Sequence, residues 1–133
     1  MQRIFFRVMM FFILITFLQS SMCSAENLKF VDSIENTGYY VDMDTVKLEG
    51  QNIINAKIAI IKINSKNNNK KHILLYNLRI NYKEQNYQVM SSTIIAYETR
   101  EVLEQDNNQT FVRFYAQDSP MFNVVNFILN GGK

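Results

Sequence analysis

The chain has 133 residues, 14 basic and 12 acidic side chains, a net charge of +2, one cysteine and one histidine. This length fits one small domain, without a second unit or a linker. A single cysteine excludes an internal disulfide, and a single histidine excludes a metal site built on two histidines.

The N-terminal segment has the pattern of a secretory signal peptide. Arg3 and Arg7 precede an apolar run over residues 8–18, which is shorter than the about 20 residues that a membrane-spanning helix needs. We expect residues 1–25 to be the signal peptide, which engages the export machinery only, and residues 26–133 to form a single domain.

The end of this segment suggests where it is cleaved. Small residues at Cys23 and Ala25 favour cleavage after Ala25. Lipidation of Cys23 is the alternative, but Met22 stands where a lipidation signal has a small residue. Either way we expect an exported protein, in the periplasm or at the cell surface.

Charge gives no indication of a nucleic-acid partner. Arg3 and Arg7 account for the whole excess of +2, so the part that remains after cleavage has as many acidic as basic residues. A neutral domain lacks the excess of positive charge that binds phosphate backbones. We therefore expect no nucleic-acid binding.

The domain begins with short extended segments. Residues 28–34 predict a first strand, and the turn over 35–38 has Gly38, which can adopt a positive φ. After an extended segment over 39–42, we expect Asp44 to cap a single helical turn and residues 49–52 to form a turn.

A long hairpin is predicted at the centre of the sheet. Residues 53–64 and 72–82 alternate apolar and polar side chains, as strands with one buried face do, and a polar turn over 65–71 joins them. The first of these strands is unusually long, and its apolar side chains switch from even-numbered to odd-numbered positions along it. We expect either a β-bulge or strong bend near Ile60 and Ile61, or a far half that is covered on both faces.

Further strands and one helix complete the chain. Strand patterns cover 87–98, 101–104 and 110–115, and the turn over 83–86 precedes the first of them. Asp118 or Ser119 can cap a helix that starts at Pro120 and ends before Gly131. The predicted fold is α+β: a single, curved antiparallel meander sheet of about five to seven strands, with one C-terminal helix packed on one face.

The residue types give no catalytic or metal site. His72 is expected to be the first residue of a strand, and neither Ser91 nor Ser92 lies in a nucleophile elbow. Asp42 and Asp44 supply too few oxygen ligands for calcium, which takes six to eight. We expect a protein that is not an enzyme and has no catalytic, cofactor-binding or metal-binding residues.

One local excess of charge is the candidate binding feature. Cations at Lys57, Lys62 and the loop residues Lys66, Lys70 and Lys71 have no acid among them. These lysines either keep an exposed loop soluble and protect the sheet edges, or they bind acidic polymers or anionic headgroups. A contrasting acidic stretch follows later in the chain, and its acids are Glu98, Glu101, Glu104 and Asp106, with Arg100 between them.

Four stretches of the chain have recognisable motifs: residues 39–46, with two adjacent aromatic residues and then an aspartate three residues before a threonine, and also 87–92, 97–104 and Ser119-Pro120-Met121. These motifs resemble the surface-adhesin protein E-like family of small exported bacterial proteins. The chain is most similar to small secreted members from bacteria with an outer membrane.

The resemblance implies an antiparallel sheet with a C-terminal helix and a binding role at the cell surface or in the periplasm. The cysteine pair of the adhesin-type members is absent here. Our leading hypothesis is a non-catalytic binding or adhesion module for a protein or polymer ligand. The alternative is a periplasmic carrier of a small hydrophobic ligand, held in a pocket between the sheet and the helix.

Overall fold

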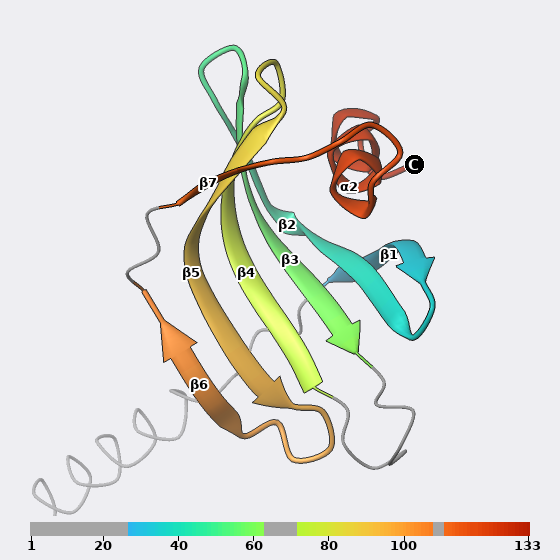
Figure 1. The fold of residues 1–133 in the computed structure, drawn as a ribbon, viewed down its shortest axis with the longest axis vertical. Helices are drawn as coiled ribbons and strands as arrows, with labels where there is room; N and C mark the ends of the chain where they lie inside the picture. The colour runs from blue at the N-terminus through green and yellow to red at the C-terminus, as the bar shows by residue number, and fades with distance from the viewer. Residues whose placement is uncertain (1–26, 63–71, 108–110) are drawn as a thin grey trace, which may run out of the picture.

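In a computed structural model, the chain folds into one antiparallel sheet with a single C-terminal helix (Figure 1). The structure describes residues 27–62, 72–107 and 111–133. Its elements are β1 (Leu28–Ile34), β2 (Thr37–Glu49), β3 (Ile53–Lys62), β4 (His72–Asn81), β5 (Asn86–Ala96), β6 (Val102–Asp106), β7 (Val112–Phe114) and α2 (Pro120–Leu129). The expected signal peptide, with Cys23 and Ala25, lies outside the described residues.

The strands follow one another in space in the order of the chain. The sheet runs β1-β2-β3-β4-β5-β6, and β7 pairs with β5 beside β6. β6 lies opposite residues 92–95 of β5, and β7 lies opposite residues 86–88, so the two short strands share one edge. Every pairing is antiparallel, which confirms the predicted curved meander of an α+β fold.

The central hairpin of β3 and β4 confirms the expected pairing. Its register is continuous from Ile53 opposite Asn81 to Lys62 opposite His72, so the bulge expected near Ile60 and Ile61 was wrong. Ile58 and the adjacent Ala59 point to opposite faces and both have no exposed surface, so the middle of β3 is covered on both faces. Apolar side chains occur at both even-numbered and odd-numbered positions here, because both faces of β3 are covered at this point.

The segment predicted as a helical turn is an irregular part of β2. Asp42 lies opposite Lys57 and Lys47 opposite Asn55, so β2 uses four residues where β3 uses one. The Thr45 hydroxyl donates to the Asp42 carbonyl at 2.7 Å and accepts the Lys57 N–H at 2.9 Å. The carboxylate of Asp42, not that of Asp44, accepts a backbone hydrogen bond. The Asp44 N–H donates to it at 3.2 Å.

The first turn also differs from the expectation. Ile34 pairs with Thr37, so the turn contains only two residues, and Glu35, not Gly38, has the positive φ of 51°. Gly38 lies within β2, where an added Cβ would stand 2.9 Å from the ring of Tyr40. The glycine is therefore explained by close packing against an aromatic ring.

The helix closes the core on one face of the sheet, which we call the helix face. Ser119 caps α2 by accepting the Phe122 N–H at 3.2 Å, Pro120 begins it, and Gly131 follows it with a φ of 72°. In Figure 1, α2 lies over the β1 and β2 side of the sheet, and its contacts are with these two strands. The buried core joins the helix to the helix face through Val41, Ile54, Ala56, Ile58, Leu78, Ile80, Val89, Tyr115, Val124, Val125 and Ile128.

Candidate binding surfaces

The predicted binding loop cannot be placed on the molecule. Lys66, Lys70 and Lys71 lie outside the described residues. The two residues that flank the loop, Lys62 and His72, are paired at the end of β3 and β4, where Lys62 is exposed and His72 is half-buried. His72 begins β4, as expected. The basic loop therefore stays a prediction from the sequence.

The edge formed by β6 and β7 is the most apolar exposed feature of the described chain. We call it the β6–β7 edge; no described strand pairs with its outer side. Every residue of both strands is exposed, although the aromatic sequence around β7 is typical of a buried strand. The large exposed apolar residues along this edge are Val102, Leu103, Phe111, Val112 and Phe114.

The position of β7 explains which of its side chains face solvent. Phe114 lies opposite Asn86 and Val112 opposite Gln88, on the face of the sheet away from the core, which we call the outer face. Phe114 is 77% exposed and Val112 is 55% exposed. Arg113, between them, lies opposite Tyr87 on the helix face. Two apolar side chains thus share one face of the edge strand.

β7 is attached firmly at its C-terminal end. The next residue, Tyr115, is only 7% exposed, and its ring centroid lies 6.5 Å from that of Tyr87. Its N–H donates to the Gln85 carbonyl at 3.1 Å. Burial raises the pKa of the Tyr115 hydroxyl above its ordinary value. The anchored tyrosine holds the adjacent Phe114 in a fixed place.

Most of the tyrosines pack in or around the core rather than forming a recognition surface. Burial, together with the charges of Asp32 and Tyr87, raises the pKa of Tyr39. Tyr76, Tyr82 and Tyr87 also pack around the buried cluster. Tyr40 lies on the outer face, where its ring meets that of Phe30 edge-on at 5.5 Å. The pattern alone does not separate these two environments.

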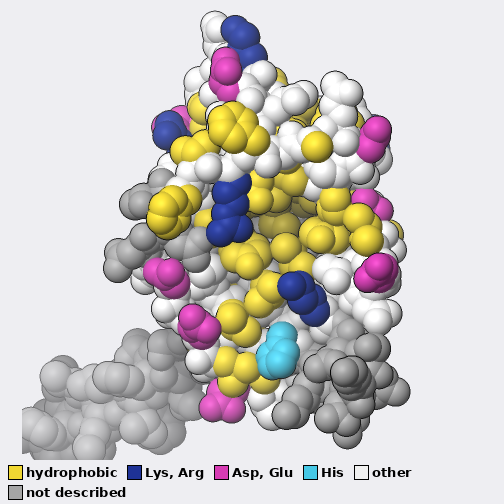
Figure 2. All heavy atoms as spheres, viewed as in Figure 1, with side chains coloured by type: hydrophobic (Ala, Val, Ile, Leu, Met, Phe, Trp, Pro, Cys, Tyr) yellow, Lys and Arg dark blue, Asp and Glu magenta, His cyan; other side chains and the backbone are white. Residues whose placement is uncertain are grey.

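The helix face is only partly covered by α2. Beyond the helix, half-buried apolar side chains extend across neighbouring strands, and Figure 2 shows apolar side chains gathered over this part of the face. Cross-strand pairing places Tyr39, Ile60, Leu74 and Ile94 in one row, next to the Tyr76 row. The space beneath the helix, in contrast, is filled by the core side chains.

The acidic stretch forms an exposed border rather than a site. Glu98, Glu101, Glu104 and Asp106 are all exposed. Glu104 and Asp106 lie opposite Ile94 and Ser92, on the helix face of β6. The Arg100 guanidinium stacks over the Tyr97 ring, 5.3 Å from its centroid. Among the described residues, no three His, Cys, Asp or Glu side chains are grouped as metal ligands.

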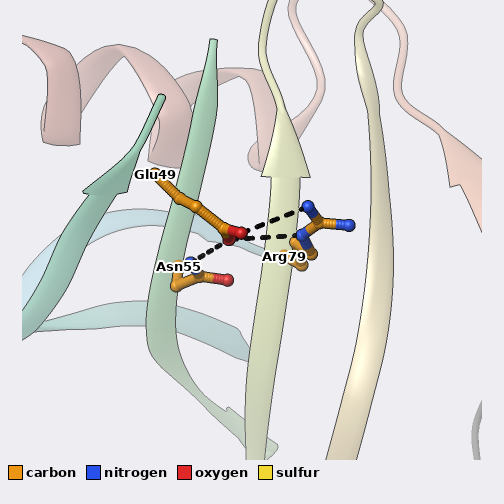
Figure 3. Close-up of polar contacts among 3 residues, drawn as sticks. All are labelled: Glu49, Asn55 and Arg79. Atoms are coloured by element: carbon orange, nitrogen blue, oxygen red, sulfur yellow. Dashed lines mark hydrogen bonds and ion pairs between the residues drawn. The ribbon is translucent and has the colours of Figure 1, made fainter. Parts of the chain in front are cut away.

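A polar cluster on the outer face is structural. Figure 3 shows the carboxylate of Glu49, at the end of β2, reaching across to Asn55 and Arg79. Asn55 Nδ2 donates to Glu49 Oε2 at 2.9 Å, and Arg79 Nε lies 3.4 Å from the same oxygen. The Asn55 hydrogen bond and the Arg79 charge lower the pKa of Glu49. The cluster links three strands and has the exposure of an ordinary surface ion pair.

No protein-family model matches the chain, and no curated protein matches it either. Within residues 27–62, 72–107 and 111–133, no helix has the length and apolar character needed to cross a membrane. The resemblance to the adhesin E-like family therefore rests on the quoted motifs.

Proposed function

We propose that the protein is an exported, non-catalytic binding module of the adhesin E-like kind, which holds an extended segment of a partner protein at the β6–β7 edge. The observation that carries this proposal is the exposure of Phe114 and Val112 on an edge strand. An edge strand offers unpaired backbone donors and acceptors, and exposed apolar side chains beside them supply burial on binding. A site with both features suits protein recognition better than catalysis.

The two halves of the edge differ in how open they are to an added strand. β6 has an acidic residue at Glu104, and its register shifts at Leu103, both of which are common protections of an edge. β7 has a charge too, at Arg113, but its register is regular across its three residues. We therefore place the centre of the contact on β7, with Phe114 as the aromatic anchor.

Charge indicates a partner different from the chain itself. Antiparallel pairing of two β7 strands about their centres would place Arg113 directly opposite its copy, and like charges in that position are destabilising. A segment with an acidic residue between two apolar residues would instead complement Arg113, Val112 and Phe114. We propose this apolar-acidic-apolar pattern for the bound strand.

The hydrophobic-carrier alternative has weaker support. A pocket between the sheet and the helix would need space where Val41, Ile54, Ile58 and Val124, each with no exposed surface, are packed together. A hydrophobic ligand would have to lie on the uncovered part of the helix face instead (Figure 2).

The test uses a photocrosslinker on the edge of the full-length protein in intact cells. Benzoylphenylalanine replaces Val112 in one variant and Leu48 in the control, because Leu48 is 71% exposed at the far end of β2. We expect a defined crosslinked species from position 112 alone. Equal products from both positions, or none from 112, would contradict the proposal. Protease accessibility in the same cells would distinguish the periplasm from the surface.

The partner identified in this way is then purified and its affinity measured. Phe114→Ser should weaken binding at least tenfold, since losing a buried aromatic anchor commonly costs about 2 kcal/mol or more. Leu48→Ser removes a similar exposed apolar side chain elsewhere and should leave the affinity unchanged. If both variants bind as the natural protein does, the edge is not the binding site.

A further inference from the structure

A second surface combines three unusual features at the β1–β2 hairpin, far from β7 in the sheet order. A hollow of about 220 Å³ opens on the outer face there. Its lining contains an aromatic pair, a strand glycine and a turn carboxylate, with polar residues at the rim. The lining residues are Phe30, Ser33, Glu35, Asn36, Thr37, Gly38, Tyr40 and Ile61.

The aromatic part of the hollow is well defined. The rings of Phe30 and Tyr40 meet edge-on, with centroids 5.5 Å apart, and Phe30 is 56% exposed. The Tyr40 ring occupies the space beside Gly38. A Cβ at position 38 would lie only 2.9 Å from this ring. The glycine therefore lets the Tyr40 ring lie close against the strand backbone. This leaves aromatic surface facing solvent at a fixed place.

The charged part of the hollow comes from a strained residue. Glu35 has a φ of 51°, a conformation that glycine or asparagine adopts more easily than glutamate. It forms no ion pair with another described residue and lines the hollow. Backbone strain of this kind is often retained where a side chain has a function. Glu35 thus lines the same hollow as the exposed Phe30 ring and the half-buried Tyr40 ring.

The chemistry of this lining favours a cation with hydrogen-bond donors. Aromatic faces attract cations, and an arginine guanidinium both stacks on aromatic rings and donates to a carboxylate in its own plane. Ser33, Asn36 and Thr37 add further polar groups at the rim. A quaternary ammonium has no donors and would leave these groups unused. We propose that the hollow binds the guanidinium of an arginine side chain from a protein partner, stacked against Phe30 and Tyr40 and paired with Glu35.

This proposal does not depend on the β6–β7 edge, and its test is independent. An isotope-labelled sample of the natural protein is titrated with the blocked tripeptide Gly-Arg-Gly and followed by backbone NMR shifts. Two other probes are the same peptide with citrulline, which keeps the shape without the charge, and tetramethylammonium. We expect saturable shifts at Glu35 and Gly38 with the arginine peptide, and at least tenfold weaker effects with the other two.

The positive φ of Glu35 allows a second measurement, the melting temperature, with Gln85 as a matched control. Glu35→Gly should raise the melting temperature, because glycine tolerates the positive φ, while weakening arginine binding at least tenfold. Gln85 has the same φ of 51° in the β4–β5 turn, so Gln85→Gly should raise the melting temperature and leave binding unchanged. Glu35→Gln, which removes only the charge, should also weaken binding.

Three results would overturn the proposal. One is an absence of saturable shifts with the arginine peptide. Another is a Glu35→Gly protein that binds arginine as the natural protein does. The third is equal binding of citrulline or tetramethylammonium, which would show that the charge with its donors is not what the hollow recognises.

Discussion

The two edges of the sheet are completed in different ways. On the β1 side, α2 covers the helix face, and Asn123 Nδ2 of the helix donates to Asp32 Oδ2 of β1 at 2.8 Å. On the β6–β7 side the described residues include no covering helix, and both short strands are exposed along their whole length. One edge thus contributes to stability, whereas the other is free to make contacts outside the molecule.

This difference separates substitutions that should unfold the protein from those that should only change its binding. Residues beneath the helix belong to the buried core, where lost contacts cannot be replaced by water. Residues on the β6–β7 edge already face water, and changes there are expected to alter stability by about 0.5 kcal/mol or less. Three substitutions on the covered side and in the outer-face cluster test this contrast.

The largest effect is expected from a cavity beneath the helix. Ile128 is 6% exposed in the core, whereas the next residue, Leu129, is 47% exposed. Ile128→Ala should reduce the free energy of unfolding by about 2–4 kcal/mol, and Leu129→Ala by about 0.5 kcal/mol or less. Chemical denaturation measures both. Similar losses at the two positions would show that the helix is not packed as described.

An intermediate effect is expected from the hydrogen bond that fixes the helix to the edge. Asn123→Ala removes the donor to the part-buried Asp32 carboxylate, and we expect a loss of about 1–2 kcal/mol. The double variant with Asp32→Ala should lose less than the sum of the two single changes, because both remove the same interaction. Strict additivity in the denaturation measurements would indicate that the two residues do not interact.

The smallest effect is expected at the exposed Glu49 cluster, and it depends on pH. Since the hydrogen bond from Asn55 and the charge of Arg79 lower the pKa of Glu49 in the folded state, its contribution is present above the unfolded pKa. The contribution is lost as the pH falls through the lower, folded pKa. A small difference in melting temperature between the natural protein and Glu49→Gln at neutral pH should therefore disappear in acid. A difference that grows in acid would have the wrong sign.

The sequence predicted the parts of the fold that depend on local patterns. Alternation located the β3–β4 hairpin, and the Ser119-Pro120 start with Gly131 at the end located the helix. Both signals arise within a few residues of the structure that they specify. The meander followed because consecutive strands usually pair with each other.

The features that were missed depend on neighbours distant in the chain. Asp42 to Thr45 has the composition of a helix cap, but the Lys57 N–H from the next strand decides the conformation by donating to Thr45. Glu35 adopts a positive φ because Ile34 pairs with Thr37 and leaves only two residues for the turn. The exposure of Phe114 depends on its pairing opposite Asn86, on the outer face of an edge strand, and no local pattern contains this pairing.

The position of α2 has a consequence for how the chain completes its fold. β1 to β6 lie in the sheet in chain order, each beside the strand before it, and β7 returns only as far as β5. α2 is the exception, because it returns from the C-terminus to the first two strands. The core is thus sealed by a segment that follows every described strand in the chain. Without α2 the apolar surface of the first two strands would stay uncovered, a state that proteases and chaperones can recognise, so docking of the helix also acts as a quality check on the sheet.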